Sequence, residues 1–313
     1  MTRVYFQRAS KGYRAVRGEV VRQIQVALRA AGADPEEIDG IYGGDTEKAL
    51  KAYQQAKGME SNGKITTETW SSLMGEAPPS LFARCLQLTG DFEGHGFQKI
   101  AGNFDGAGLT WGIIGFTLQH GELKRIISEV AQQYPALLDQ AFGSLRDDLL
   151  DVLRQSKNEQ IAWANAISIG SNKYRVQGPW EQAFATLGTF PEVQAVQLKR
   201  VGAYWDIALR DTKRFGLKSE RGLALCFDIA VQNGGIDFAQ EERGILKWLA
   251  NHPDAVESDK LARIADVVAE NSRPQYVEDV RRRKRTIATG DGVVHGARYA
   301  TQDWGIAEHP WIV

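Results

Sequence analysis

The stretch Gly75-Glu76-Ala77-Pro78-Pro79-Ser80 places the strongest constraint on how this chain can fold. The paired prolines exclude a helix here and make the connection stiff. A chain of 313 residues has room for one or two domains. We therefore predict a small domain over residues 1–76, a linker at 77–80 and a larger domain over 81–313.

Short helical patterns separated by glycine-containing loops fill the first segment. Apolar residues recur at helical spacing over 20–31, and Gly32 ends that pattern. A second helix opens at Asp45 or Thr46, either of which can cap its N-terminus, and a third begins near residue 66. Three short helices make a small domain near the lower size limit for an independent core.

The second segment is mainly helical, and no internal repeat is apparent in the chain. Helical patterns occur at 123–138, 145–154, 159–169, 193–215, 220–231, 240–250, 259–270 and 274–289. Glycines over 94–115, with a turn at 103–106, predict a small β-hairpin or sheet. We therefore expect a mainly α fold of the α+β kind, with a small sheet inside the larger domain.

The bulk composition excludes several classes of partner and cofactor. A net charge of −1 gives no basic surplus that would attract nucleic acid. Cys85 and Cys226 lie in apolar helical contexts and are expected to be buried thiols, without a disulfide framework. The five histidines show no metal-ligand spacing, so we expect neither a metal nor a cofactor. A monomer is the default expectation.

The N-terminus lacks the apolar run of a secretory signal, and no segment approaches the ~18 apolar residues of a membrane span. We therefore expect no stable membrane insertion and synthesis in the cytoplasm. A protein of this kind would reach a cell wall or periplasm after lysis or through a dedicated secretion system.

Two carboxyl groups and a hydroxyl lie at the start of the glycine-rich stretch or within it. Glu93 follows Phe92 at the end of an apolar helix, a position that suits a general acid because the acid must keep its proton near neutral pH. Asp105 lies in a turn rich in backbone N–H groups, which favour a carboxylate. Glycoside hydrolysis needs one carboxyl to protonate the leaving oxygen and another to activate water, which the Thr110 hydroxyl can share.

The first segment carries three pieces of a known pattern in order, at residues 20–28, 38–43 and 46–54. They are a helix that carries Val-x-x-Ile-Gln, a loop with Asp-Gly-x-Tyr-Gly and a second helix that carries Thr-x-x-Ala-Leu-x-x-Tyr-Gln. Together they resemble the common three-helix peptidoglycan-binding module. The resemblance implies that peptidoglycan glycan strands are the partner, and that the ligand groove lies near the loop of Asp39, Tyr42 and Gly43.

Residues 93–116 resemble the active-site segment of chitosanases of glycoside hydrolase family 46 and, more broadly, the Glu–Asp–Thr arrangement of phage-type lysozymes. The matching positions are Asp105-Gly106, Gly108, Thr110 and Gly112-Ile113-Ile114-Gly115-Phe116. The resemblance implies a lysozyme-like fold, with Glu93 as acid, Asp105 as base and Thr110 as the residue that positions water. It also implies inversion at the anomeric carbon.

A second patch, over 194–208 and 227–235, resembles helices of the same chitosanases. By that match Asp228 is a buried carboxylate that pairs with an arginine near the active site. The candidates are Arg281, Arg282 and Arg283; we take Arg282 as the expected partner, and the choice among the three stays open.

Departures from the chitosanase pattern bear on the substrate. The family's arginine between the two glycines is Ala107 here, its His-Gly is Asn233-Gly234, and the interval from Glu93 to Asp105 is shorter. Chitosan is a polycation, and chitosanase clefts are strongly acidic. These departures, together with the wall-binding module, point instead to the glycan strands of peptidoglycan.

The sequence thus predicts a muramidase that cleaves the β-1,4 bond between N-acetylmuramic acid and N-acetylglucosamine, as in a phage endolysin or an injected effector. Three alternatives remain open: a chitosanase with a wall anchor, a lytic transglycosylase that needs only Glu93, and a non-catalytic wall-binding protein.

Overall fold

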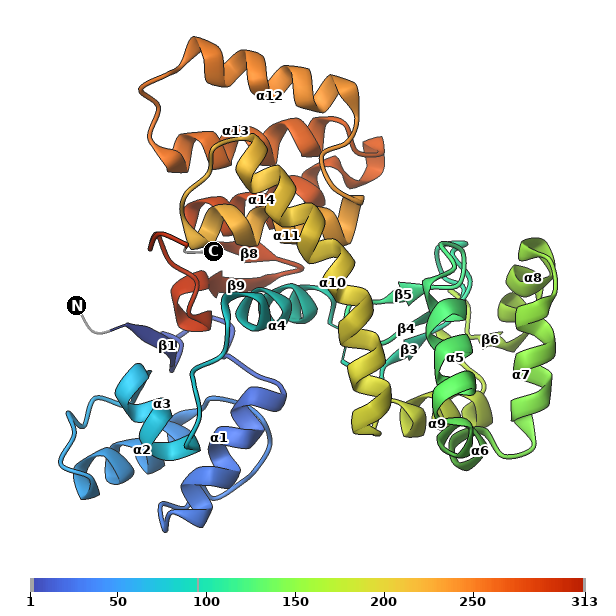
Figure 1. Cartoon of the computed structure of the whole chain (residues 1–313), viewed down its shortest axis with the longest axis horizontal. Helices are drawn as coiled ribbons and strands as arrows, with labels where there is room; N and C mark the ends of the chain where they lie inside the picture. Colours follow the sequence, from blue (N-terminus) through green and yellow to red (C-terminus); the bar gives the residue numbers. More distant parts are fainter. Residues whose placement is uncertain (1–2, 95, 312–313) are drawn as a thin grey trace. The chain divides into compact units, whose positions relative to one another are not determined.

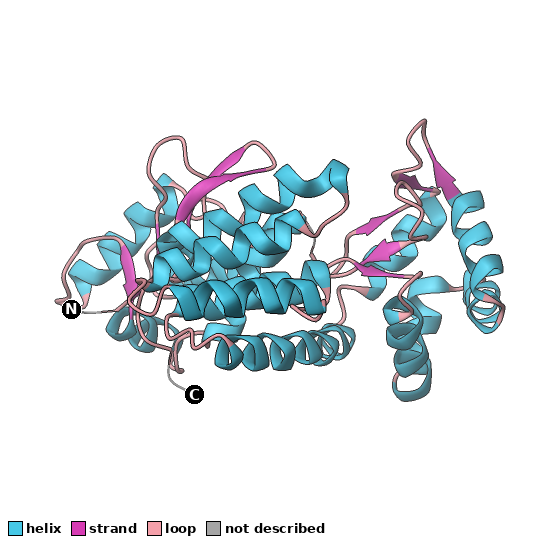
Figure 2. Cartoon of the chain, turned by 90° about the horizontal axis from the view of Figure 1, so that it is seen from above, coloured by secondary structure: helices cyan, strands magenta, loops and turns pink. Residues whose placement is uncertain are grey.

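The computed structural model describes residues 3–94 and 96–311. By spatial contacts the chain divides into two compact units, one formed by residues 1–92 with 204–313 and the other by residues 93–203. Both units are mainly helical with short antiparallel strands, which confirms the predicted fold class (Figure 1, Figure 2).

The N-terminal part of the first unit contains the three predicted helices. Two short strands that the sequence patterns do not predict accompany them and pair antiparallel. Phe6 of the first strand is fully buried, and its ring centroid lies 6.4 Å from that of Trp70. The elements are β1 (Val4–Gln7), α1 (Glu19–Ala30), α2 (Gly44–Ala56), β2 (Lys64–Thr66) and α3 (Thr67–Met74). The predicted sequence boundary at 77–80 stays a prediction.

The rest of the first unit is a group of helices around α11, with a hairpin beside them (Figure 1). Every residue from 220 to 230 is buried, so α11 is its central helix. The elements are α4 (Leu81–Glu93), the second half of α10 (Pro191–Arg214), α11 (Glu220–Asn233), α12 (Ala239–Asn251), α13 (Glu257–Glu270), the 3-10 turn η1 (Pro274–Tyr276), α14 (Val277–Thr289), β8 (Asp291–Val294), β9 (Ala297–Ala300) and the 3-10 turn η2 (Thr301–Trp304).

The second unit contains the predicted small sheet, whose strands run in the order β3-β4-β5 and are all antiparallel. One predicted helix, over 123–138, is two helices in the structure. Pro135 cannot continue a hydrogen-bonded helix and restricts Tyr134 before it. The elements are β3 (Ile100–Ala101), β4 (Thr110–Trp111), β5 (Phe116–Thr117), α5 (Glu122–Gln133), α6 (Pro135–Phe142), α7 (Leu145–Arg154), α8 (Lys157–Ile167), β6 (Ser168–Ile169), β7 (Arg175–Val176) and α9 (Gly178–Leu187).

Candidate active site

The Asp-Gly loop of the N-terminal module is held from inside by a buried glutamine of α1. The Gln25 amide donates hydrogen bonds to the Asp39 carboxylate (2.8 Å) and to the Thr46 hydroxyl (3.0 Å), and its carbonyl accepts the Gly40 N–H at 2.8 Å. Partial burial acts to raise the pKa of Asp39, but hydrogen bonds from Gln25 and the Ile41 amide outweigh it and lower that pKa. Asp39 therefore shapes the loop.

The same loop corrects the predicted ligand role of Tyr42. Its side chain is fully buried, and its hydroxyl donates to the Gly63 carbonyl at 3.2 Å. The Tyr42 amide also donates to the Val16 carbonyl at 2.8 Å, which fixes the backbone with the ring turned into the core. Gly43, which is partly exposed, is the N-cap of α2. Tyr42 is thus a core residue and offers no surface to a glycan.

A second buried glutamine repeats this arrangement one helix later. The Gln54 amide donates to the Thr69 hydroxyl at 3.3 Å, and its carbonyl accepts the Gly63 N–H at 2.9 Å. Asn62 corresponds to Asp39. Its side-chain oxygen accepts the Lys64 N–H at 2.9 Å, as the Asp39 carboxylate accepts the Ile41 N–H. The module therefore contains an internal repeat of helix, glutamine and Asx-Gly loop, contrary to the expectation of none.

Asp105 lies on a tight loop that leads from β3 to β4. The residue is exposed, and its carboxylate accepts the Ala107 N–H at 3.0 Å, as expected for a turn rich in backbone donors. The Asn103 side chain accepts the Gly108 N–H at 2.9 Å. Gly108 has a φ of +79°, and a Cβ there would come within 2.8 Å of the Ile161 side chain. The loop conformation thus depends on glycine at this position.

Thr110 begins β4, the central strand of the sheet, where it pairs with Ala101 on one side and Thr117 on the other. The residue is 6% exposed, so its hydroxyl lies mostly away from solvent. The structure therefore places Asp105 and Thr110 on one loop-and-strand segment, in which Asp105 is exposed and Thr110 is buried in the sheet.

Glu93 is the last residue of α4 and is half-buried. The Lys99 carbonyl accepts the Gly112 N–H at 3.0 Å, and the Lys99 ammonium donates to the Gly94 carbonyl at 2.6 Å, so Lys99 links Gly94 to the turn that follows β4. Glu93, Asp105 and Thr110 thus all belong to the second unit.

A fully buried glutamine of α10 strengthens this connection. The Gln197 amide donates to the Phe97 carbonyl at 3.1 Å, and its carbonyl accepts the Ile113 N–H at 3.0 Å. It therefore joins the segment after Glu93 to the turn after Thr110. Gln197 is a residue for which we predicted no role, although a glutamine beside Val196 and Val193 on an apolar helix face is the signal that would have indicated one.

Residues before Glu93 hold the end of α4 within the first unit. The Asp91 carboxylate accepts hydrogen bonds from Arg14 at 2.9 and 3.2 Å and from the Tyr299 hydroxyl at 2.6 Å. The Phe92 ring packs edge-on against Tyr299, with centroids 4.8 Å apart, and the Arg283 guanidinium lies 5.4 Å from its centroid. The residue preceding Glu93 is therefore clamped on two sides.

Asp228 is the buried carboxylate that the sequence predicts, but Arg282 is not its partner. Asp228 accepts hydrogen bonds from Arg283 at 2.7 Å, from Lys284 at 2.6 Å and from the Thr89 hydroxyl at 3.2 Å. Arg282 is exposed and donates to Glu278 at 2.8 Å. On α14 the buried face includes residues 283 and 284, which turns residue 282 to solvent.

The charges around Asp228 set its ionisation. Burial alone would raise the pKa of this carboxyl, but the charges of Arg283 and Lys284, and their hydrogen bonds, hold the pKa well below its usual value. Asp228 is therefore ionised, and it ties α11 to α14 and, through Thr89, to α4.

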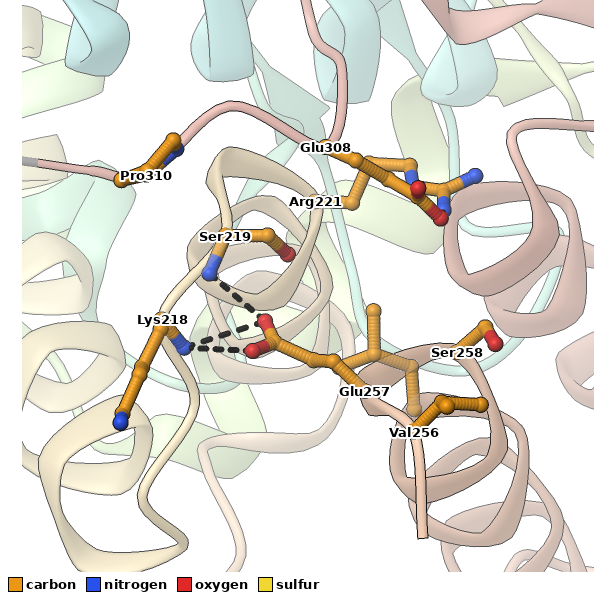
Figure 3. A pocket seen from close by; sticks show the side chains of 9 residues that line it. Lys218, Ser219, Arg221, Val256, Glu257, Ser258, Glu308 and Pro310 are labelled. Atoms are coloured by element: carbon orange, nitrogen blue, oxygen red, sulfur yellow. Dashed lines mark hydrogen bonds and ion pairs between the residues drawn. The ribbon is translucent and has the colours of Figure 1, made fainter.

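A cavity of about 220 Å³ lies elsewhere in the first unit, between the starts of α11 and α13 (Figure 3). The Glu257 carboxylate accepts the backbone N–H groups of Lys218, at 2.9 and 3.0 Å, and Ser219, at 2.6 Å. Arg221 pairs with Glu308 at its edge. Since Glu257 is engaged with backbone donors, we interpret this cavity as a structural joint, and it contains none of the predicted site residues.

Two further properties concern only residues 3–94 and 96–311. Within these ranges no group of His, Cys, Asp or Glu side chains converges to hold a metal ion. No helix there has the length and apolar character needed to cross a bilayer. Cys85 and Cys226 are buried free thiols, as predicted.

Comparison with known proteins identifies the N-terminal segment. The family model described as "Putative peptidoglycan binding domain" matches residues 17–73, which confirms the resemblance seen in the sequence. No curated protein sequence matches the chain.

Two solved structures are similar to about two thirds of the chain. A Gynuella sunshinyii GH46 chitosanase in complex with chitotetraose shares 17% identity with a TM-score of 0.46, over 68% of this chain and 87% of that chain. A mutant chitosanase from Bacillus subtilis MY002, complexed with 6 GlcN, shares 18% identity with a TM-score of 0.48, over 70% and 96%. At identities and TM-scores this low, the likeness assigns no activity.

Proposed function

We propose that this chain is a peptidoglycan hydrolase of the muramidase type, which cleaves the β-1,4 bond between N-acetylmuramic acid and N-acetylglucosamine with inversion. The observation that carries the proposal is the peptidoglycan-binding match over residues 17–73 in a chain that also holds the Glu–Asp–Thr segment. A wall-binding module raises the local concentration of an attached enzyme on an insoluble polymer.

The three residues take distinct roles in the proposed reaction. Glu93 donates its proton to the glycosidic oxygen as the bond to the anomeric carbon breaks. Asp105 accepts a proton from the attacking water, and the Thr110 hydroxyl orients that water. Support for these roles comes from the common unit that contains all three residues, and from the exposed position of Asp105 on a loop fixed by backbone donors.

The decisive experiment is digestion of purified peptidoglycan, with mass spectrometry of the soluble products. Wild type is expected to release muropeptides with a reducing end, and Glu93→Gln and Asp105→Asn are expected to release none. Asp148→Asn, which changes an exposed carboxylate of the same unit, is the matched control and should digest like wild type. Retained activity in Glu93→Gln would contradict the assignment of the acid.

The products also separate the alternatives. Anhydro-muropeptides would identify a lytic transglycosylase, and in that case Asp105 should be dispensable. If peptidoglycan is untouched and soluble chitosan is cut, the chain shares the substrate named for the chitosanases that it resembles. Tight wall binding without cleavage of either polymer would leave the non-catalytic reading.

A further inference from the structure

Two exposed aromatic rings stand beside the proposed base. Phe104, which immediately precedes Asp105, is 48% exposed, Tyr174 is 37% exposed, and their centroids lie 5.2 Å apart. In the described part of residues 93–203, the large hydrophobic side chains left exposed to this degree are these two and Ile169. Ile169 and Tyr174 both come from the β6–β7 hairpin, so the exposed apolar surface of this unit gathers at one place.

The backbone beneath the two rings is held firmly. The Tyr174 carbonyl accepts the Gly102 N–H at 2.7 Å, and the Ser168 hydroxyl oxygen accepts the Asn103 N–H at 2.8 Å. A Cβ on Gly102 would come within 2.3 Å of the Lys173 carbonyl oxygen, so only glycine permits this close approach. The rings therefore stand on a loop and a hairpin that are already docked on each other.

Lys99 connects this surface to the proposed acid. Its ammonium donates to the Gly94 carbonyl at 2.6 Å, directly after Glu93, and lies 6.0 Å from the centroid of the Tyr174 ring. Contacts thus run without a break from the neighbour of Glu93, through Lys99 and Tyr174, to the neighbour of Asp105.

We propose that Phe104 and Tyr174 form a sugar-binding subsite that takes an uncharged, N-acetylated pyranose next to the bond that is cleaved. This inference rests on the proposed function. A pyranose presents C–H groups on one face, which suit the negative face of an aromatic ring. The Lys99 ammonium repels the protonated amine of a glucosamine unit, whereas an N-acetyl group carries no charge. The subsite therefore favours peptidoglycan or chitin chemistry over chitosan.

The test uses Glu93→Gln as an inactive background and calorimetric titration with two probes, N-acetylglucosamine oligosaccharides and glucosamine oligosaccharides at neutral pH. Phe104→Ala and Tyr174→Ala should each bind the N-acetylated probe about three- to tenfold more weakly, as expected for loss of one aromatic contact. Phe238→Ala is the matched control, since Phe238 is a more exposed aromatic ring (65%) that belongs to the other unit. Thermal melts confirm that each variant is folded.

Lys99 provides an independent measurement. Lys99→Gln should improve binding of the glucosamine probe relative to the N-acetylated probe, because it removes the repelling charge. Unchanged affinity in both alanine variants, or a Lys99→Gln variant with the same preference as wild type, would overturn the subsite.

The two proposals can fail separately. If wild type digests peptidoglycan and the alanine variants digest it with unchanged KM and kcat, the subsite is wrong and the muramidase assignment stands. If wild type releases no muropeptides but the alanine variants still lose affinity for the N-acetylated probe, the subsite stands and the muramidase assignment is wrong.

Discussion

The Asp228 carboxylate lies 2.7 Å from the Arg283 guanidinium, and both side chains are almost completely withdrawn from solvent. Fifty-five positions separate the two residues in sequence. Lys284 and Thr89 complete the coordination of the same carboxylate. The arrangement joins α4, α11 and α14, so the helix that ends at Glu93 is packed against a charged cluster whose members depend on one another.

Neutralising this carboxylate should destabilise the protein strongly. Asp228→Asn leaves two cations buried without their counter-charge, and breaking a buried ion pair in this way costs about 3–5 kcal/mol. Urea unfolding measures the loss. Arg282→Gln, which removes only an exposed pair with Glu278, should change the free energy of unfolding by less than about 1 kcal/mol. If Asp228→Asn lowered the free energy of unfolding by no more than about 1 kcal/mol, as expected for Arg282→Gln, the buried cluster would not be important for stability.

Glu241 is expected to make the stability of the protein depend on pH. Burial, together with the charges of Asp237 and Asp211, raises its pKa to about 7 from an ordinary value of 4.5, although a backbone hydrogen bond from Phe238 opposes the shift. Between these values the folded protein holds a proton that the unfolded chain has released. The free energy of unfolding therefore falls as pH rises through this window.

Glu241→Gln should remove that dependence and stabilise the protein above pH 7 by about 1–3 kcal/mol. Urea unfolding at about pH 5, near the lower end of the window, and at about pH 8, above it, tests the sign. Glu242→Gln is the control, because the neighbouring carboxylate is paired with Arg214 at 3.1 Å. A variant whose stability falls with pH as steeply as wild type would refute the assignment to Glu241.

The Thr110 hydroxyl is expected to act in the chemical step. Thr110→Val keeps the shape of a side chain that is 6% exposed in the central strand, and removes only the hydroxyl that we propose orients water. Loss of one such hydrogen bond typically lowers kcat about a hundredfold. Thr110→Ser, which keeps the hydroxyl, should stay close to wild type. A fully active valine variant, measured by muropeptide release, would exclude this role.

Gln197 is expected to affect activity indirectly, because it positions the segments that contain Phe97 and Ile113. Gln197→Leu leaves the Phe97 carbonyl and the Ile113 N–H without their partner, which costs about 1–3 kcal/mol in stability. Phe97 follows Glu93 closely in sequence, and Ile113 follows Thr110. We therefore expect kcat to fall more than KM rises. Gln194→Leu is the matched control, since that side chain donates to the Gly188 carbonyl at 2.9 Å on the same helix. A parallel loss in both variants would indicate a purely structural effect.

Local patterns account for most of what could be predicted. Helical spacing located the three module helices, and the glycine-rich stretch located the sheet that carries Thr110. Such features depend on residues close in sequence. The side to which Tyr42 points depends on Gly63 and Val16, which the loop pattern alone does not reveal.

The wrong choice of Arg282 as the partner of Asp228 had a different cause. Val280 and Ile287 are buried on α14, and Arg283 and Lys284 fall on the same helical face at spacings of three and four residues. This periodicity was present in the sequence, so the correct partners could have been chosen from it. By contrast, the pairing of Arg14 with Asp91 joins segments 77 positions apart, and no local pattern indicates it.

The contacts of residues 3–17 limit how the wall-binding module can be exchanged for another. Arg14 contacts Asp91, Tyr13 forms a bridge with Arg298, and β1 packs against η2 near the C-terminus. A graft that replaced everything before residue 77 would remove the Arg14 contact from the helix that ends at Glu93, and the other two contacts from β9 and η2. A recombinant chimera should instead retain residues 3–17, β1 included, and substitute only the helical segment that follows, with the new β2 chosen to pair with the retained β1.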